Sequence, residues 1–149
     1  MSTPREVKQY RKRVSGPILD RIDLHVEVPE VDVQAFRDNQ KSSLSTDSSL
    51  VVRERIAKVR NIQETRFVKE LIYTNAEMRN AHIKNYASLT KEAELVLTRA
   101  ALQYWLSARS FMNMIKIART IADLENTQQI EKHHMAEALQ YRPKAYELE

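Results

Sequence analysis

Apolar residues recur every three or four positions through residues 48–142, and this spacing predicts a succession of helices. Thr90 is a residue type that caps a helix N-terminus, and a helix before Pro143 must end there. The predicted helices cover about 48–69, 76–86, a segment after Thr90, a segment from Ser107, and about 134–142. Together they predict a mainly α fold, a small helical bundle with one core.

The N-terminal part of the chain has a different pattern. Thr3-Pro4-Arg5-Glu6 has the form of a capping box, which predicts a short helix from Pro4 to near Val14. Residues 22–28 alternate between apolar and polar side chains, which predicts one β-strand. Because a lone strand leaves its backbone groups unpaired, we expect residues 1–29 to be the C-terminal remnant of a larger, sheet-containing domain.

The remaining boundaries follow from composition. Residues 30–47 include a polar, serine-rich stretch without periodicity, which predicts a linker. Residues 48–142 are the helical bundle. Residues 143–149 form a tail, whose last pair, Leu148-Glu149, has the form of a vector-derived remnant.

Composition excludes several kinds of site. The chain of 149 residues has a single glycine, Gly16, and no cysteine. A phosphate-binding loop, a dinucleotide fingerprint and a hydrolase nucleophile elbow each need two or more glycines, and disulfides and thiolate metal sites need cysteine. No stretch is long and apolar enough for a membrane span, so we expect a soluble, cytoplasmic protein with no membrane partner.

Two arginines lie where a phosphate could be bound. Arg109 falls in the first turn of the helix from Ser107, where a cation is disfavoured by the helix dipole but an anion is favoured. Arg21 lies in the turn before the predicted strand, and sites are usually built at such ends. For both residues an ordinary exposed arginine is the alternative explanation.

Residues 53–69 are basic, with six Lys and Arg against two Glu, a local excess equal to the net charge of +4 of the whole chain. Arg53, Arg60 and Lys69 are candidate nucleic-acid contacts here, although a solvated face is the commoner explanation. Tyr104 and Trp105 could stack on a base, but they adjoin an apolar stripe, which favours core positions. His133 and His134 are adjacent, which predicts divergent side chains, and no metal site is expected.

Three segments resemble a known family. They are Tyr10-Arg11-Lys12-Arg13-Val14-Ser15-Gly16-Pro17-Ile18-Leu19-Asp20-Arg21-Ile22-Asp23-Leu24-His25-Val26-Glu27-Val28, Leu106-Ser107-Ala108-Arg109 with Ile117-Ala118-Arg119-Thr120-Ile121-Ala122-Asp123-Leu124, and Glu137-Ala138-Leu139-Gln140-Tyr141-Arg142. On these residues the chain resembles the C-terminal part of magnesium-chelatase-related AAA+ ATPases of the ComM (YifB) type.

The resemblance implies an AAA+ lid preceded by a remnant of the ATPase core. It implies that Arg21 is an arginine finger acting in trans, that Arg109 is the sensor-2 arginine, and that Arg119 is a secondary nucleotide contact. It also implies a parent protein that binds ATP and Mg²⁺ through its own N-terminal core, assembles into a ring, expected to be a hexamer, and works on DNA in recombination or natural transformation. Without Walker A and Walker B motifs, this chain alone is not expected to bind nucleotide or hydrolyse ATP.

Two alternatives stay open. The chain could be a stand-alone helical module that binds nucleic acid or protein through the basic segment at 53–69. It could also be an interaction domain whose task is to assemble subunits.

Overall fold

The computed structural model describes residues 21–28 and 48–142 of the chain. Five α-helices and two 3₁₀ turns follow one another through the second range: α4 (Ser49–Arg66), η1 (Asn75–Glu77), α5 (Asn80–Tyr86), α6 (Lys91–Tyr104), α7 (Ala108–Leu124), α8 (Lys132–Ala138) and η2 (Leu139–Tyr141). The predicted helical bundle is therefore confirmed. The predicted helix at 4–14, the linker at 30–47 and the tail at 143–149 lie outside the described residues.

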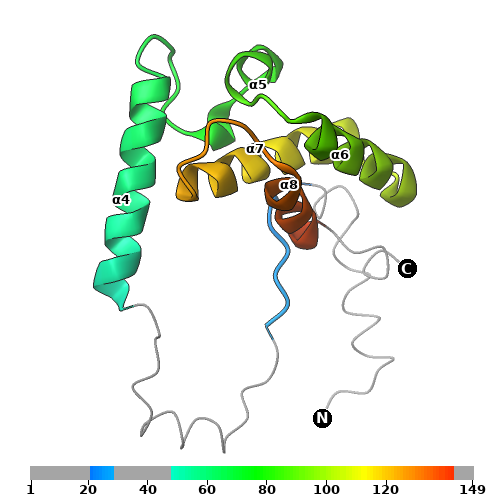
Figure 1. Ribbon diagram of the computed structural model, residues 1–149, viewed down its shortest axis with the longest axis horizontal. Coiled ribbons are helices and arrows are strands. Elements are labelled where there is room, and N and C mark those ends of the chain that lie inside the picture. Colours follow the sequence, from blue (N-terminus) through cyan, green and yellow to red (C-terminus); the bar gives the residue numbers. More distant parts are fainter. Residues whose placement is uncertain (1–20, 29–47, 143–149) are drawn as a thin grey trace, which may run out of the picture.

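Helix α7 is the centre of the bundle. Its apolar side is buried at positions three or four residues apart, including Met114, Ala118, Ile121 and Ala122. Helices α6 and α8 pack against it and against each other, with α5 and η1 along its length (Figure 1). The loop before α6 is tied to the loop before α8 by Thr90 N–H to the Ile130 carbonyl, 3.0 Å.

The hydroxyl cap predicted at Thr90 is present, and the structure shows a second hydroxyl cap at Ser107. The Thr90 hydroxyl accepts from the amide of Ala93 at the start of α6. The Ser107 hydroxyl accepts from the amide of Ser110 at the start of α7. Each cap satisfies an otherwise unpaired amide of the first turn, which fixes where the helix begins.

Two predicted helix boundaries are wrong. The first helix ends at Arg66, three residues earlier than predicted, because Phe67 turns inward, is 2% exposed and packs edge-on against Tyr86, with 5.4 Å between ring centroids. The segment 76–86 is two elements and not one helix. Met78 has an extended backbone and a buried side chain, which separates η1 from α5.

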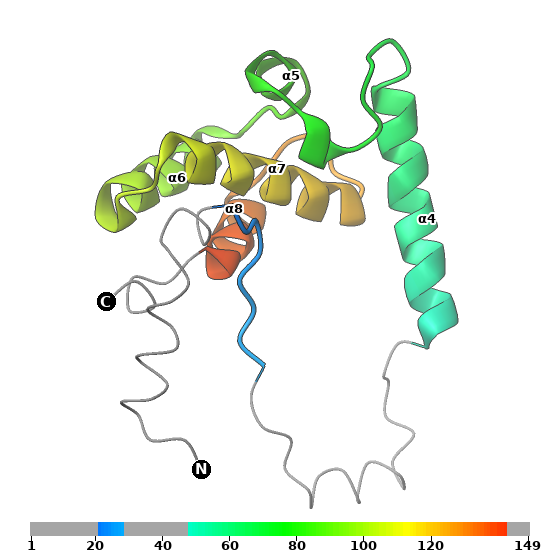
Figure 2. The same cartoon turned by 180° about the vertical axis from the view of Figure 1, so that it is seen from behind.

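Helix α4 stands apart from the rest of the bundle, and both views show it projecting from one end of α7 (Figures 1 and 2). Only Val59 and Gln63 are buried along its 18 residues. Its N-terminal half exposes the apolar residues Leu50, Val51, Val52 and Ile56. The helix is thus anchored to the bundle through its C-terminal turns.

Residues 21–28 form no strand in the structure, so the strand predicted at 22–28 is not observed. The described residues include no strand with which it could pair, and a strand cannot exist without such pairing. The segment instead runs beside α8 (Figure 2), with the His25 amide donating to the Tyr141 carbonyl at 2.9 Å. Its apolar side chains are exposed: Ile22, Leu24, Val26 and Val28.

Candidate functional site

A polar cavity lies along the first turns of α7. Arg109, Asn113 and Lys116 line it from one face of that helix, since they are four and three residues apart. Asp23 lines it from the segment 21–28, and Asn80 from the start of α5. Its volume is about 370 Å³. The cavity therefore joins segments that are far apart in the sequence around two cationic side chains.

Hydrogen bonds place most of these side chains. Asn113 is buried and donates from Nδ2 to Asp23 Oδ1 at 2.6 Å. Lys116 is half-buried and donates from Nζ to the Ala76 carbonyl at 2.9 Å. Arg109 is exposed and makes no hydrogen bond or ion pair with the described part of the chain. Its guanidinium therefore remains available to an anion.

The charges in the cavity act on one another. Partial burial lowers the pKa of Lys116, because a charged amine loses hydration there. The Asp23 carboxylate opposes this and raises the Lys116 pKa, while the positive charge of Arg109 lowers it further. Lys116 is thus under the influence of one carboxylate and one further cation, and a bound anion would reduce the repulsion between Lys116 and Arg109.

The structure places the segment that contains Arg21 next to α7, the helix that contains Arg109. Arg21 is exposed and lies two residues before Asp23, which binds Asn113 of α7. Arg21 makes no hydrogen bond or ion pair within the ranges 21–28 and 48–142. Its segment and the first turns of α7 therefore form one face of the molecule.

Arg119 has a structural position. Its side chain is 1% exposed, and its guanidinium is bound on three sides. Nε donates to Asp123 Oδ1 at 3.1 Å, while Nη1 and Nη2 donate to the carbonyls of Gln128 and Thr127 in the loop after α7. The expectation that Arg119 faces a nucleotide is not supported by this geometry, because a buried guanidinium that holds a loop has no free face for phosphate.

A buried polar network around Asp123 was not predicted from the sequence. Arg66 Nη1 donates to Asp123 Oδ2 at 2.8 Å, and Asn75 Nδ2 donates to the same oxygen at 2.7 Å. Burial alone would raise the pKa of Asp123, but the bonds from Arg66 and Asn75 and the charge of Arg119 outweigh it and hold the pKa below its usual value. The pair Arg119 and Asp123, four apart on an otherwise apolar face, was the signal in the sequence.

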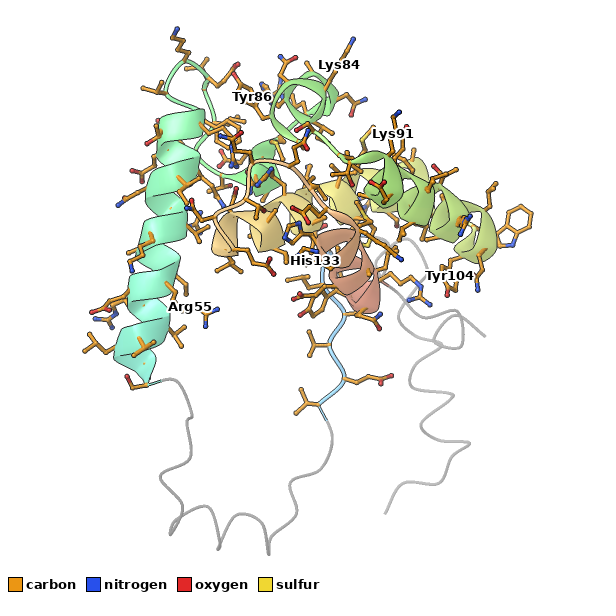
Figure 3. The ribbon with its side chains drawn as sticks, viewed as in Figure 1. Arg55, Lys84, Tyr86, Lys91, Tyr104 and His133 are labelled. Carbon is orange, nitrogen blue, oxygen red and sulfur yellow. The ribbon has the colours of Figure 1, made fainter. Side chains whose placement is uncertain are left out.

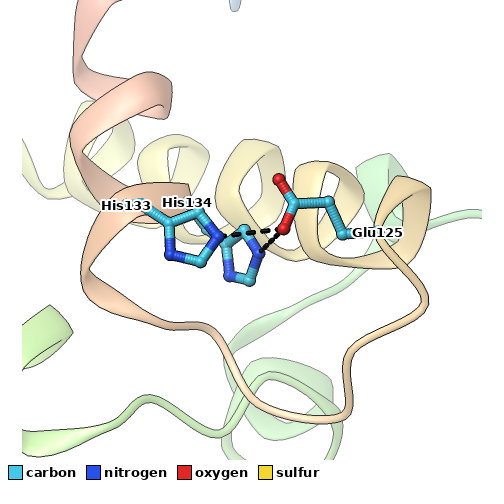
Figure 4. Close-up of side chains that lie close together, drawn as sticks. All are labelled: Glu125, His133 and His134. Atoms are coloured by element: carbon cyan, nitrogen blue, oxygen red, sulfur yellow. Dashed lines mark hydrogen bonds and ion pairs between the residues drawn. The ribbon is translucent and has the colours of Figure 1, made fainter.

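Glu125, His133 and His134 converge at the start of α8 (Figure 4). Glu125 Oε2 lies 2.9 Å from His133 Nε2 and 3.0 Å from His134 Nε2. The prediction that adjacent histidines diverge is wrong here. His134 turns back so that its Nδ1 accepts from the amide of Glu131 at the N-cap, 2.9 Å, which brings its ring beside that of His133.

The proton positions favour a hydrogen-bonded cluster over a metal centre. Because His134 Nδ1 accepts an amide proton, a neutral His134 carries its own proton on Nε2 and donates it to Glu125. A ligating histidine normally keeps a proton on the other nitrogen, and here that nitrogen is the acceptor. Hydrogen bonds from His133 and His134 lower the pKa of Glu125, and the bond to Glu125 raises the pKa of His133.

The basic candidates of the first bundle helix do not lie on one helical face. Arg53 and Arg60 are exposed on α4, seven residues apart, whereas Lys69 is exposed in the turn that follows the helix. Arg66 is withdrawn from this surface by its bonds to Asp123. Arg55 also projects from α4 (Figure 3).

The aromatic pair after α6 is not in the core, which corrects the interpretation from the apolar stripe. Trp105 is 91% exposed, with a left-handed backbone (φ 51°, ψ 46°) that ends the helix. Tyr104 lies at the end of α6 (Figure 3), and the guanidinium of Arg142 lies over its ring at 3.6 Å from the centroid. Ala100 is the last buried residue of α6, and the helix continues to Tyr104 before the chain turns at Trp105.

Comparison with known proteins identifies the bundle. Residues 46–142 match the family described as magnesium chelatase, subunit ChlI C-terminal. The chain belongs to this family. Residues 1–36 match a second family, described as magnesium chelatase, subunit ChlI. The C-terminal match covers all the described helices, so Arg109 lies in the magnesium chelatase C-terminal domain, while Arg21 lies in the range of the second match.

Curated relatives agree with this membership. Competence protein ComM of Haemophilus influenzae is 37% identical over 141 residues, which is 95% of this chain and 26% of that protein. The uncharacterized protein YifB of Escherichia coli is 32% identical over 140 residues, 94% of this chain and 26% of that protein. The ComM-type resemblance is thus confirmed. The chain spans about a quarter of the length of these relatives.

Within residues 21–28 and 48–142, no helix has both the length and the apolar character that a membrane span requires.

Proposed function

We propose that this magnesium chelatase C-terminal domain is the lid and arginine-finger part of an AAA+ ATPase, which holds ATP and Mg²⁺ in a separate ATPase core. The observation that carries the proposal is the state of Arg109, an exposed guanidinium beside a polar cavity with no partner among the described residues. The family match and the likeness to Competence protein ComM support the assignment.

The side chains at the cavity suit a phosphate. ATP with Mg²⁺ supplies the phosphoryl group, whose transfer spreads negative charge over the γ-phosphate oxygens. Arg109, as sensor 2, donates two parallel N–H groups to such oxygens, and Lys116 adds a point charge beside them. Arg21, as an arginine finger, stabilises the same charge on nucleotide held by a neighbouring subunit. These roles require the two arginines to be exposed, as both are.

The bundle would transmit the state of the nucleotide mechanically. A helical domain with one core moves as a rigid body when a subunit interface changes. The parent protein would therefore form a homo-oligomeric ring, a hexamer by family resemblance, in which ATP turnover moves the lids and performs work on DNA during recombination or natural transformation. The chain alone, in the cytoplasm or in vitro, would not hydrolyse ATP.

The experiment uses the parent protein with its ATPase core. Arg109→Ala is expected to lower kcat for ATP at least tenfold with ring assembly unchanged, and Arg21→Ala by about 10³-fold or more. Arg99→Ala, which removes an exposed arginine of α6, is the matched control and should retain full activity. Size-exclusion chromatography with light scattering monitors assembly in each variant.

Three results would contradict the proposal. If Arg109→Ala hydrolyses ATP at the wild-type rate, the arginine does not contact nucleotide. If the variant loses assembly and activity together, the alternative of a domain that only joins subunits is favoured. For the chain by itself, ATP turnover above background would show that a phosphate-binding loop elsewhere is not needed.

A second candidate function is a helical module that binds nucleic acid or an acidic protein through α4. The observation that favours it is the exposure of Arg53 and Arg60 on a helix with few buried residues. A basic surface of this kind binds a phosphate backbone without sequence preference, and its affinity falls steeply with salt.

A further inference from the structure

The polar cavity on α7 already contains an anion that belongs to the chain. Asp23 Oδ1 accepts the Asn113 amide at 2.6 Å, and its charge acts on Lys116, which lies one turn further along the helix. Asp23 is exposed, so its carboxylate is not fixed there by burial. Carboxylate and phosphate oxygens accept the same N–H donors from arginine, lysine and amide side chains.

Removal of Asp23 from the cavity would leave two cations and no anion. Arg109 makes no hydrogen bond or ion pair in the described ranges, and Lys116 uses one of its three donors on the Ala76 carbonyl. Such a site attracts a polyphosphate more strongly than the same site with the carboxylate in place. Asp23 and a phosphate group would therefore compete for the Asn113 amide and for the positive charges of Arg109 and Lys116.

Asp23 also helps to attach the segment that contains Arg21 to the bundle. The bond from Asn113 and the bond from the His25 amide to the Tyr141 carbonyl tie residues 21–28 to the bundle. Most side chains of this segment are exposed, so apolar burial contributes little to holding it. Loss of the Asp23 bond would weaken the attachment of the whole segment.

We propose that Asp23 is an intramolecular competitor for a polyphosphate site formed by Arg109, Asn113 and Lys116, and that polyphosphate binding there releases the segment 21–28. The inference rests on the proposed function, because it takes the Arg109 site as the phosphate site. It adds Asn113 and Lys116 as ligands and Asp23 as a positioning residue. Binding of polyphosphate at the Arg109 site would thereby increase the mobility of Arg21.

Inorganic tripolyphosphate is the probe, titrated by calorimetry into the 149-residue chain at low ionic strength. Asp23→Asn keeps an oxygen that can accept from Asn113 but removes the charge, and should tighten binding about two- to fivefold, as expected for an exposed charge. Glu27→Gln removes an equal charge from the same segment, away from the cavity residues, and should change affinity by less than about 1.5-fold. Arg109→Ala and Lys116→Gln should each weaken binding.

A second readout follows the segment itself. Saturating tripolyphosphate should accelerate hydrogen exchange of the His25 amide in the wild-type chain, since the bond to Tyr141 is loosened. Circular dichroism melts confirm that each variant is folded. A purely structural Asp23 would leave this exchange rate unaffected by the probe.

The outcomes separate the two proposals. If Arg109→Ala and Lys116→Gln bind tripolyphosphate as the wild type does, the cavity is not an anion site and the proposed role of Arg109 fails with the inference. If those variants weaken binding while Asp23→Asn matches Glu27→Gln, or while His25 exchange is unchanged at saturation, the inference about Asp23 is overturned and the role of Arg109 stands.

Discussion

Arg66 at the end of α4 and Asp123 near the end of α7 form a bidentate ion pair. Arg66 Nη1 donates to Asp123 Oδ2 at 2.8 Å, and Nη2 donates to Oδ1. The Asp123 side chain is 1% exposed and that of Arg66 16%. Asn75 and Arg119 donate to the same carboxylate, so the network joins α4, η1 and α7. It is the main polar connection between α4 and the bundle among the described residues.

Replacement of Asp123 by Asn should disrupt this network and lower the free energy of unfolding. The variant leaves Arg66 and Arg119 without their shared carboxylate, and loss of one partner of a buried pair typically lowers the free energy of unfolding by about 3–5 kcal/mol. Urea denaturation followed by far-UV circular dichroism measures the change. Glu54→Gln, an exposed carboxylate of α4, is the control and should cost under about 0.5 kcal/mol. A loss below about 1 kcal/mol for Asp123→Asn would contradict the role of the network.

The Glu125 and His133 pair predicts a pH window for stability. The lowered pKa of Glu125 means that its contribution is present above its unfolded value of about 4.3 and is lost as pH falls through the folded pKa. The raised pKa of His133 means that its contribution is complete below its unfolded value of about 6.5 and is lost as pH rises through the folded pKa. The pair therefore stabilises most between about pH 4.5 and 6.5.

Thermal melts across pH test this window. The difference in Tm between the wild type and His133→Gln should be largest near about pH 5.5 and should disappear by about pH 9. Lys132→Gln, the exposed neighbour on α8, should show no such maximum. A Tm difference for His133→Gln that is constant from pH 5 to pH 9 would show that His133 acts through packing alone.

Trp105 offers a stabilising substitution. A left-handed backbone is unfavourable for a large side chain by about 1 kcal/mol, and Asn adopts it more readily. Since Trp105 is 91% exposed, little burial is lost, and Trp105→Asn should raise the free energy of unfolding by about 0.5–1 kcal/mol. The exposed Leu102 has helical backbone, so Leu102→Asn should lower it by a similar amount. Equal decreases in the free energy of unfolding of the two variants would show that the left-handed backbone at Trp105 is not strained.

Binding of DNA by the basic residues of α4 and of the turn that follows it would depend on salt concentration. If these residues bind single-stranded DNA, replacing Arg53, Arg60 and Lys69 by Gln should reduce the slope of log K against log salt by about 2, because three phosphate contacts are lost. Fluorescence anisotropy with a dT oligonucleotide at several salt concentrations measures this slope. A control with Lys84, Lys91 and Lys132 replaced by Gln has the same charge change on other elements. Equal slopes in the two triple variants would rule out a specific role for α4.

The helices could be predicted because their signals are local. Periodic apolar residues and a hydroxyl cap such as Thr90 depend on neighbours within one turn, and the Thr90 cap forms as expected. The breaks at Phe67 and Met78 could not be predicted, since each is made by burial against distant parts of the bundle. Tertiary packing overrode local propensity at both positions.

The candidate site was predictable in part. Arg109 was found from its place in the first turn of a helix and from family resemblance, and its partners were not, because Asp23 lies 90 residues from Asn113 in the sequence. The burial of Asp123 was not predicted either, because it depends on Asn75 and Arg66 reaching it from other elements. Pairings of this kind are fixed only by the folded arrangement.

Because α4 is attached to the bundle at its C-terminal end, a tilt at that end displaces its N-terminal end furthest. From Arg66 to Ser49 the helix extends about 25 Å at 1.5 Å per residue. A tilt of about 10° at the Arg66–Asp123 pivot would then sweep the far tip through about 4 Å. Small rearrangements at the end of α7 would therefore displace the exposed residues Leu50 and Val51 by a larger distance.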